Sequence, residues 1–226
     1  MMVILHYSKN QHWDNSEGTI KVLDKFKSIL DKTYPNTNKR RDQNCITMEF
    51  SEFRLDVVPA FSNKGGYYQI PDSVRKVWVD TDPFTFAEFI TSLNKRLSGC
   101  FIPLIKIIKG WNRNEGWPIR SFHLECLMYN HFNRYITSYS YPFMIQDFFA
   151  ALPSYLNSVT YDPVKGDQVD SYLDNSAIKT KRQIAIEKAR NAKEKSKEAY
   201  GDQERYPTVA IGEWKKILGE FFPSYG

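Results

Sequence analysis

Residues 53–61 read FRLDVVPAF, an apolar strand pattern that carries a single carboxylate at Asp56. Burying an unpaired carboxylate costs several kcal/mol, and side chains alternate between the two faces of a strand. Asp56 therefore lies on the face opposite Leu55 and Val57. Two interpretations remain open: Asp56 faces solvent, where Arg54 on the same face can pair with it, or it binds a divalent metal together with another carboxylate.

Ahead of residue 82 the chain has the pattern of strands with one helix among them. The predicted strands cover residues 1–7, 44–50, 54–59, 67–71 and 76–79. The short turn at 51–52 joins one hairpin, and the loop at 64–66 leads into a second. Apolar spacing over 19–33 predicts a helix whose buried face is formed by Ile20, Leu23, Phe26, Ile29 and Leu30.

After residue 82 the apolar spacing becomes helical. Asp82 is a predicted helix cap, with Pro83 at the first helical position. The predicted helices cover residues 84–97, 101–111, 120–135, 142–156, 179–200 and 207–222. The fold class is therefore α+β, and we expect residues 1–82 to form a mixed domain and residues 83–226 an all-helical one.

The composition is that of a folded protein in a reducing compartment. Of the 226 residues, 42% are apolar and 15% aromatic, which excludes a disordered or low-complexity chain. The three cysteines lie far apart in the sequence and form no metal-binding pattern, so we expect neither a disulfide framework nor a zinc site. The apolar runs are too short to span a bilayer. We expect a soluble, cytoplasmic protein that does not bind membranes.

The net charge of +5 favours polyanionic partners without requiring them. Two basic runs, at residues 39–41 and 179–197, are interpreted as solvated surface, because such runs usually are. Lys106 and Lys109 lie three residues apart and share a helix face. One of them can hold a phosphate as a point charge, but from the pattern alone two solvated lysines on an amphipathic helix are the favoured interpretation.

Residues 120–125, which read RSFHLE, begin a predicted helix. The Ser121 hydroxyl either caps this helix or receives an anion together with the helix N-terminus. His123 and Glu125 have no companion at metal-ligand spacing, so His123 is interpreted as a packed or surface residue. The chain contains no G-x-S-x-G, P-loop or G-x-G-x-x-G motif, so hydrolase and Rossmann chemistry are not indicated.

Taken together, the order of these motifs resembles that of the bacterial CD-NTases, which are relatives of cyclic GMP-AMP synthase and oligoadenylate synthase. The matching segments are residues 53–61, 68–71 (YQIP), 78–83 (WVDTDP), 104–112 (LIKIIKGWN), 121–125 (SFHLE), 161–163 (YDP) and 211–214 (IGEW). The resemblance covers nearly the whole chain. It implies a polymerase-β-like nucleotidyltransferase core followed by a helical domain, with nucleotides bound in the cleft between them.

The resemblance also implies roles for individual residues. Asp56 would be the third catalytic and metal-binding carboxylate, on Mg²⁺ or Mn²⁺, in a reaction where a ribose hydroxyl attacks an α-phosphate. The nucleotide-binding residues would be Lys109 on the triphosphate, Ser121 as a hydrogen-bond donor, Phe122 stacked on a base, and Lys106. The substrates would be nucleoside triphosphates, and the cyclic oligonucleotide product would switch on an effector in antiviral defence.

The sequence departs from the family at its start. The family carries a Gly-Ser pair followed by an Asp-x-Asp motif, and neither precedes Asp56 here. Residues 1–5 resemble the strand that follows those aspartates. We therefore expect a chain cut just after the metal site and impaired in catalysis. Two alternatives stay open: a catalytically inactive relative that binds nucleotide or a partner, and, ranked last, a nucleic-acid module using the helix at 179–197.

Overall fold

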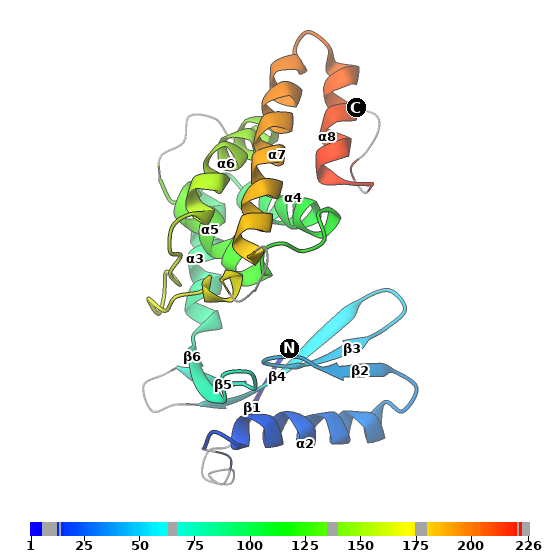
Figure 1. The fold of residues 1–226 in the computed structure, drawn as a ribbon, viewed down its shortest axis with the longest axis vertical. Coiled ribbons are helices and arrows are strands. Elements are labelled where there is room, and N and C mark those ends of the chain that lie inside the picture. The colour runs from blue at the N-terminus through cyan, green and yellow to red at the C-terminus, as the bar shows by residue number, and fades with distance from the viewer. Residues whose placement is uncertain are drawn as a thin grey trace. The chain divides into compact units, whose positions relative to one another are not determined.

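The computed structural model describes residues 1–5, 13, 15–62, 67–134, 140–174, 180–220 and 222. Within the described residues the chain forms two compact units, Met1–Pro83 and Phe84–Gly226 (Figure 1). Some of the sequence predictions fall outside the described residues: the end of the first strand at 6–7, the loop at 64–66, the helix end at 135, Lys179 and Phe221. No described helix combines the length and the apolar character needed to cross a membrane.

The first unit is a six-stranded sheet with one long helix, α2 (Gly18–Thr33), packed against it (Figure 1). The strands are β1 (Met2–Leu5), β2 (Asn38–Arg41), β3 (Ile46–Glu49), β4 (Arg54–Ser62), β5 (Tyr68–Asp72) and β6 (Val77–Thr81). Strands β2 to β6 follow one another in order as antiparallel neighbours, and β1 pairs with β4 in parallel. Both predicted hairpins are confirmed.

The helix in this unit is fixed by a close backbone contact and by a narrow apolar face. At its first residue, Gly18, an added Cβ would lie 1.8 Å from the Trp13 carbonyl oxygen, so only glycine fits. The buried cluster on the sheet consists of Val22, Leu23 and Ile46, with Phe26 and Leu30 partly buried beside it. The prediction that Ile29 is buried is wrong, because the helix turns Val22 toward the sheet and leaves Ile29 half exposed.

The interpretation of the basic run at residues 39–41 as solvated surface is confirmed for Arg40 and Arg41, which are exposed, and is wrong for Lys39. The run belongs to β2, an edge strand that pairs with β3. The Lys39 side chain is buried, and its ammonium donates to the carbonyl of Tyr34 at 2.6 Å and lies 3.6 Å from the Asp31 carboxylate. The Lys39 stem packs in the protein while its ammonium reaches acceptors at the end of α2, an arrangement known as snorkelling. A count of charges in the sequence cannot predict it.

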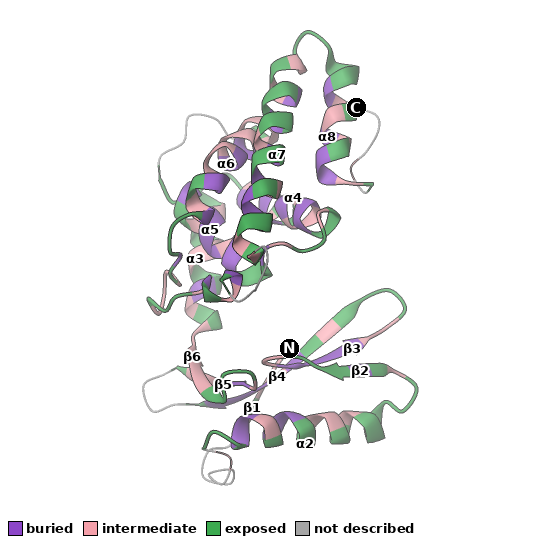
Figure 2. Cartoon of the chain, viewed as in Figure 1, coloured by how far each residue is buried: buried purple, intermediate pink, exposed green. Residues whose placement is uncertain are grey.

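The second unit is all-helical, as the sequence predicts. Its helices are α3 (Pro83–Arg96), α4 (Phe101–Asn114), α5 (Ser121–Phe132), α6 (Tyr141–Leu156), α7 (Lys181–Asp202) and α8 (Pro207–Leu218), with the short 3-10 helix η2 (Ser171–Leu173). Helix α7 packs between α6 and α8 through small buried residues, whereas most of its charged residues face solvent (Figure 2). The basic run over the described part of this helix is therefore a solvated face.

Candidate functional site

Asp56 lies in β4 with its side chain on the exposed face of the strand. Its Oδ1 accepts a hydrogen bond from the Thr47 hydroxyl at 2.7 Å, and Thr47 is directly opposite it on β3. The expected partner, Arg54, instead lies 3.8 Å from Glu49. Of the two interpretations, solvent exposure describes Asp56 in this structure, and its immediate partner is a hydroxyl.

The start of β1 runs alongside Asp56. The amino group of Met1 donates to the Asp56 carbonyl oxygen at 2.6 Å, and the parallel register pairs Met2 with Val58. Nearby, burial and the Asp56 charge together raise the pKa of the Cys45 thiol to about 11, so this cysteine stays a neutral thiol at physiological pH. This corner therefore offers one carboxylate and one hydroxyl.

That donor set does not fit a pair of Mg²⁺ ions. Among the residues with described positions, no three His, Cys, Asp or Glu side chains come together as a metal site. Mg²⁺ offered a single carboxylate keeps most of its water, and a two-metal site needs carboxylates that bridge or flank both ions. The described residues around Asp56 therefore do not form a two-metal site.

Lys109 in α4 forms an ion pair with Glu125 in α5. The Lys109 side chain is 32% exposed and that of Glu125 is 23% exposed, so both are half-buried. Lys106, one turn earlier on α4, is exposed. The two lysines proposed from the sequence therefore differ: Lys106 lies in solvent, and Lys109 is held against the neighbouring helix by a carboxylate that the sequence analysis assigned no role.

Ser121 is the first residue of α5, and the residue before it, Arg120, occupies the N-cap position with extended backbone. The interpretation that Ser121 caps the helix is therefore wrong, because a residue inside the helix cannot fill the flanking position. Phe122 follows on the next face, 41% exposed, with its ring edge-on to Phe86 at 5.1 Å between centroids. An exposed ring backed by a second aromatic is a surface on which a base can stack.

A buried histidine fixes the start of this helix. Both ring nitrogens of His123 are engaged, Nδ1 with the Tyr172 hydroxyl and Nε2 with the Thr160 hydroxyl, each at 3.0 Å. The same Tyr172 oxygen accepts from the backbone N–H of Arg120 at 2.7 Å, and the Arg120 guanidinium lies 4.3 Å from the Tyr172 ring centre. Burial lowers the pKa of His123 to about 4, so the imidazole is neutral. The packed interpretation of His123 is confirmed.

The segment that supplies Thr160 and Tyr172 is anchored by Arg182 of α7. The guanidinium lies 2.6 Å from the fully buried carboxylate of Asp170 and 2.6 Å from Asp174, and it donates to the carbonyl of Leu156 at 2.7 Å. A planar guanidinium suits this arrangement because it presents several donors in fixed directions. Nothing in the sequence indicates the roles of Tyr172 and Arg182, since no spacing rule links either residue to its partners.

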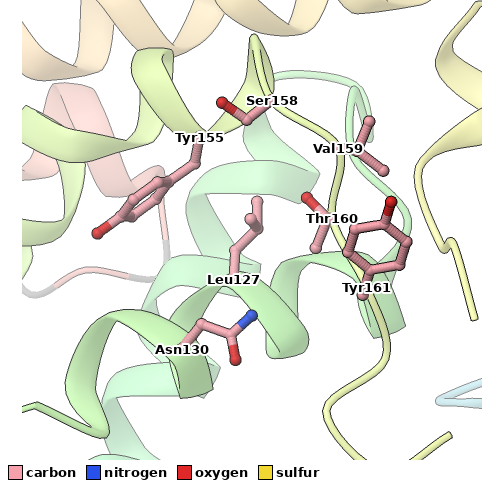
Figure 3. Close-up of a pocket in the computed structure, with 7 residues that line it drawn as sticks. All are labelled: Leu127, Asn130, Tyr155, Ser158, Val159, Thr160 and Tyr161. Atoms are coloured by element: carbon pink, nitrogen blue, oxygen red, sulfur yellow. The ribbon is translucent and has the colours of Figure 1, made fainter. Parts of the chain in front are cut away.

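A pocket of 260 Å³ lies between α5, the end of α6 and the segment that follows α6 (Figure 3). It is lined by Leu127, Asn130, Tyr155, Ser158, Val159, Thr160 and Tyr161. The Tyr155 hydroxyl at its wall bonds to Nδ1 of the buried His131 at 2.8 Å. None of the residues proposed from the sequence lines this pocket, so it does not contribute to the candidate site.

Comparison with known proteins gives consistent matches. Residues 2–94 match the family described as the Second Messenger Oligonucleotide or Dinucleotide Synthetase domain. The chain is 32% identical to a probable cyclic nucleotide synthase of Bacillus cereus (strain VD146), over 93% of this chain and 66% of that protein. It is 30% identical to a cyclic AMP-AMP-AMP synthase of Acinetobacter sp. (strain ATCC 27244 / 9458), over 94% of this chain and 62% of that protein. The chain thus spans less than two thirds of either relative.

Among solved structures, the chain resembles Escherichia coli MS115-1 CdnC with ATP, with a TM-score of 0.68 and 15% identity over 98% of this chain and 77% of that one. At this identity the likeness concerns the fold. It confirms the fold class that the sequence predicts, a polymerase-β-like core followed by helices.

Proposed function

Because the chain belongs to the CD-NTase family of second-messenger oligonucleotide and dinucleotide synthetases, we propose that it is a nucleotidyltransferase that joins nucleoside triphosphates into cyclic oligonucleotides. The observation that carries the proposal is the similarity to two cyclic nucleotide synthases over 93% and 94% of the chain. In such a reaction a ribose hydroxyl attacks an α-phosphate, a new phosphodiester forms, and pyrophosphate leaves.

In the helical unit we assign nucleotide recognition to four side chains. Lys109 neutralises the triphosphate, and Ser121, at the start of α5, donates a hydrogen bond to it. Phe122 stacks on a base, supported by its edge contact with Phe86. Lys106, exposed one turn from Lys109, adds positive charge to the approach of the nucleotide.

In the sheet unit we assign the catalytic carboxylate to Asp56. A divalent metal, Mg²⁺ or Mn²⁺, would lower the cost of charge on the reacting oxygens. Since the described residues provide one carboxylate for it, we propose that the 226 residues by themselves bind nucleotide but catalyse the transfer slowly or not at all. The second candidate function follows from the same observation: a catalytically inactive relative that binds a nucleotide or a partner protein.

The family membership also suggests the biological setting. We propose that the product acts as a second messenger on a downstream effector in antiviral defence. A cytoplasmic location suits a protein that uses nucleoside triphosphates. It also suits the three cysteines, which are unpaired in the structure.

The test compares two forms of the protein with labelled nucleoside triphosphates and Mg²⁺ or Mn²⁺. One form is the 226-residue chain, and the other carries an added N-terminal segment with Asp-x-Asp. The parallel pairing of β1 with β4 places residues added ahead of Met1 beside Asp56. The readout is the amount of labelled product that resists phosphatase treatment, since a cyclic product has no terminal phosphate to be removed.

We expect the extended form to make product and its Asp56→Asn variant to make none, while the 226-residue chain binds ATP without turnover. Rapid turnover by the 226-residue chain would show that the proposed impairment of catalysis is wrong. An extended form that binds ATP but makes no product would favour the inactive relative, and absence of ATP binding in both forms would overturn both functions.

A further inference from the structure

The ion pair between Lys109 and Glu125 connects two segments that are separate in the sequence. Lys109 is in α4 and Glu125 is in α5, sixteen residues later. By contrast, the pairs Lys21–Glu17 and Lys216–Glu213 each join residues three or four positions apart along one helix or its N-cap, so they do not fix one element against another. The Lys109–Glu125 pair therefore sets where the Lys109 ammonium lies relative to α5.

Helix geometry places Glu125, the partner of that ammonium, on the same face of α5 as Ser121. The two residues are four apart, so they lie one above the other with Cβ atoms about 6 Å apart. The Lys109–Glu125 pair therefore brings the ammonium to the face of α5 that carries Ser121. An ammonium donates up to three hydrogen bonds, Glu125 accepts one, and the side chain remains exposed enough to meet a solute.

We propose that Glu125 is a positioning residue, which holds the Lys109 ammonium beside Ser121 so that both meet the phosphates of one nucleoside triphosphate. The inference rests on the proposed function, because it assumes that Lys109 and Ser121 receive a triphosphate. A free lysine side chain samples many rotamers and loses that freedom on binding. Glu125 restrains the side chain before the nucleotide arrives, which reduces the entropy lost on binding.

Glu125 has a second, opposite effect, because its negative charge repels phosphate. At a surface site, a carboxylate about 6 Å from a phosphate weakens binding by about threefold. If Glu125 were only a nearby charge, every neutral replacement would tighten ATP binding equally. If it positions Lys109, replacements that keep an oxygen acceptor for the ammonium will bind ATP more tightly than those that do not.

The experiment measures ATP affinity of the full 226-residue chain by calorimetry, using Glu125→Gln and Glu125→Met. Both variants remove the charge and keep a side chain of similar length, but only the amide oxygen of Gln can accept from Lys109. We expect Glu125→Gln to bind ATP as tightly as the unchanged chain or up to about threefold more tightly. We expect Glu125→Met to bind about fivefold more weakly, because its lysine is no longer restrained.

Two further variants test whether Glu125 acts through the lysine. In a Lys109→Ala background the difference between Gln and Met at position 125 should vanish, since there is no ammonium left to position. The variant Glu213→Ala, which removes a half-buried carboxylate from an ion pair in α8, should leave ATP affinity within about twofold. Thermal melting monitors folding, and Glu125→Ala replaces Glu125→Met if the latter does not melt cooperatively.

The outcomes separate the inference from the proposed function. If the unchanged chain binds ATP, and Gln and Met at position 125 bind it equally, Glu125 is only a nearby charge and the inference is wrong. The same conclusion follows if the Gln–Met difference persists without Lys109. If the unchanged chain does not bind ATP at all, the proposed nucleotide site itself falls, and the inference falls with it.

Discussion

His123 lies in α5 and Lys109 contacts the same helix, but their electrostatic environments differ. Lys109 is half-buried and forms an ion pair with Glu125. His123 is buried between two hydroxyl groups, so its neutral form is the stable one. The first arrangement is compatible with the proposed recognition of an anion, and the second provides a rigid support for the start of α5.

Replacing Lys109 with alanine should weaken ATP binding by at least about 1 kcal/mol, the usual loss for a charge-assisted contact. The measurement is the dissociation constant of ATP by calorimetry. Lys216→Ala is the matched control, because Lys216 is an exposed lysine of α8 paired within its own helix, and it should leave the affinity unchanged. Unchanged affinity in Lys109→Ala would show that this lysine does not contact the triphosphate.

The buried imidazole of His123 predicts a loss of stability in weak acid. Burial lowers its pKa from 6.5 to about 4, so between these values the unfolded chain binds more protons than the folded one. The contribution of the neutral His123 to the free energy of unfolding is therefore complete above pH 6.5 and is lost as the pH falls below 6.5. From pH 7 to pH 5 the free energy of unfolding should drop by about 2 kcal/mol on account of His123.

The measurement is urea unfolding at pH 7 and pH 5, for the unchanged chain and for His123→Gln. The variant should lose less stability between the two pH values than the unchanged chain does. His131, whose pKa is also lowered by burial, gives a drop of the same sign in both proteins and cancels in the comparison. Equal losses in the two proteins would mean that His123 does not titrate on unfolding.

At the scale of residues, the sequence identified candidate site residues better than it identified their hydrogen-bond and ion-pair partners. A carboxylate in an apolar strand drew attention to Asp56, but its hydrogen-bond partner Thr47 depends on the register of the hairpin. Likewise the helical spacing drew attention to Lys109, whereas Glu125 becomes its partner only once α4 packs against α5. Alternation and spacing follow from local geometry, but partners depend on tertiary packing, which no local pattern encodes.

At the scale of elements, the candidate site depends on how α5 begins. Its first turn is held by Tyr172 and Thr160, and the segment that carries both is tied to α7 through Arg182. The arginine is therefore structural, although it lies in the basic run at 179–197 that the sequence predicts to be solvated surface. The sequence predicted the helices themselves because their apolar periods are long, but it gave no sign of this tie.

Arg182→Ala should destabilise the chain by about 3 kcal/mol, because it leaves the buried Asp170 carboxylate without its counter-charge. Arg182→Lys should recover only part of the loss, since an ammonium cannot reach both aspartates with the same geometry. Arg190→Ala, at an exposed position of the same helix, is the control and should cost less than about 0.5 kcal/mol. Urea unfolding at pH 7 measures all three, and equal effects at 182 and 190 would contradict the tie.

Element boundaries were predicted best where chemistry marks them. Helix α3 begins at Pro83, as the Asp82-Pro83 pair predicts. By contrast, β2 was missed because Asn38–Arg41 is polar and basic, and an edge strand needs few apolar residues when its pairing comes from the backbone. In α2 the predicted buried face was shifted, because Val22 lies at the centre of the face that contacts the sheet and Ile29 lies at its edge.

At the scale of the whole molecule, the two units differ in the size of their cores. Among the described residues of the first unit, one buried cluster comprises Val22, Leu23 and Ile46, and further buried apolar side chains such as Met48 and Phe61 lie in the strands. The cluster of the second unit extends through all of its α-helices and includes large side chains such as Trp111 and Phe148. Because stability scales with buried apolar area, the sheet unit should open at lower cost than the helical unit.

Native-state hydrogen exchange should therefore reveal two levels of protection. Backbone amides of β3 and β4 should exchange through openings at least about 2 kcal/mol cheaper than those that expose α6 and α7. Val22→Ala, which shrinks the smaller core, should lower protection in the strands and leave α6 unchanged. Leu152→Ala, in the larger core, should lower protection in α6. If both substitutions reduced protection everywhere by the same amount, the chain would unfold as one cooperative unit, and the helical unit would not stay folded while the sheet was open.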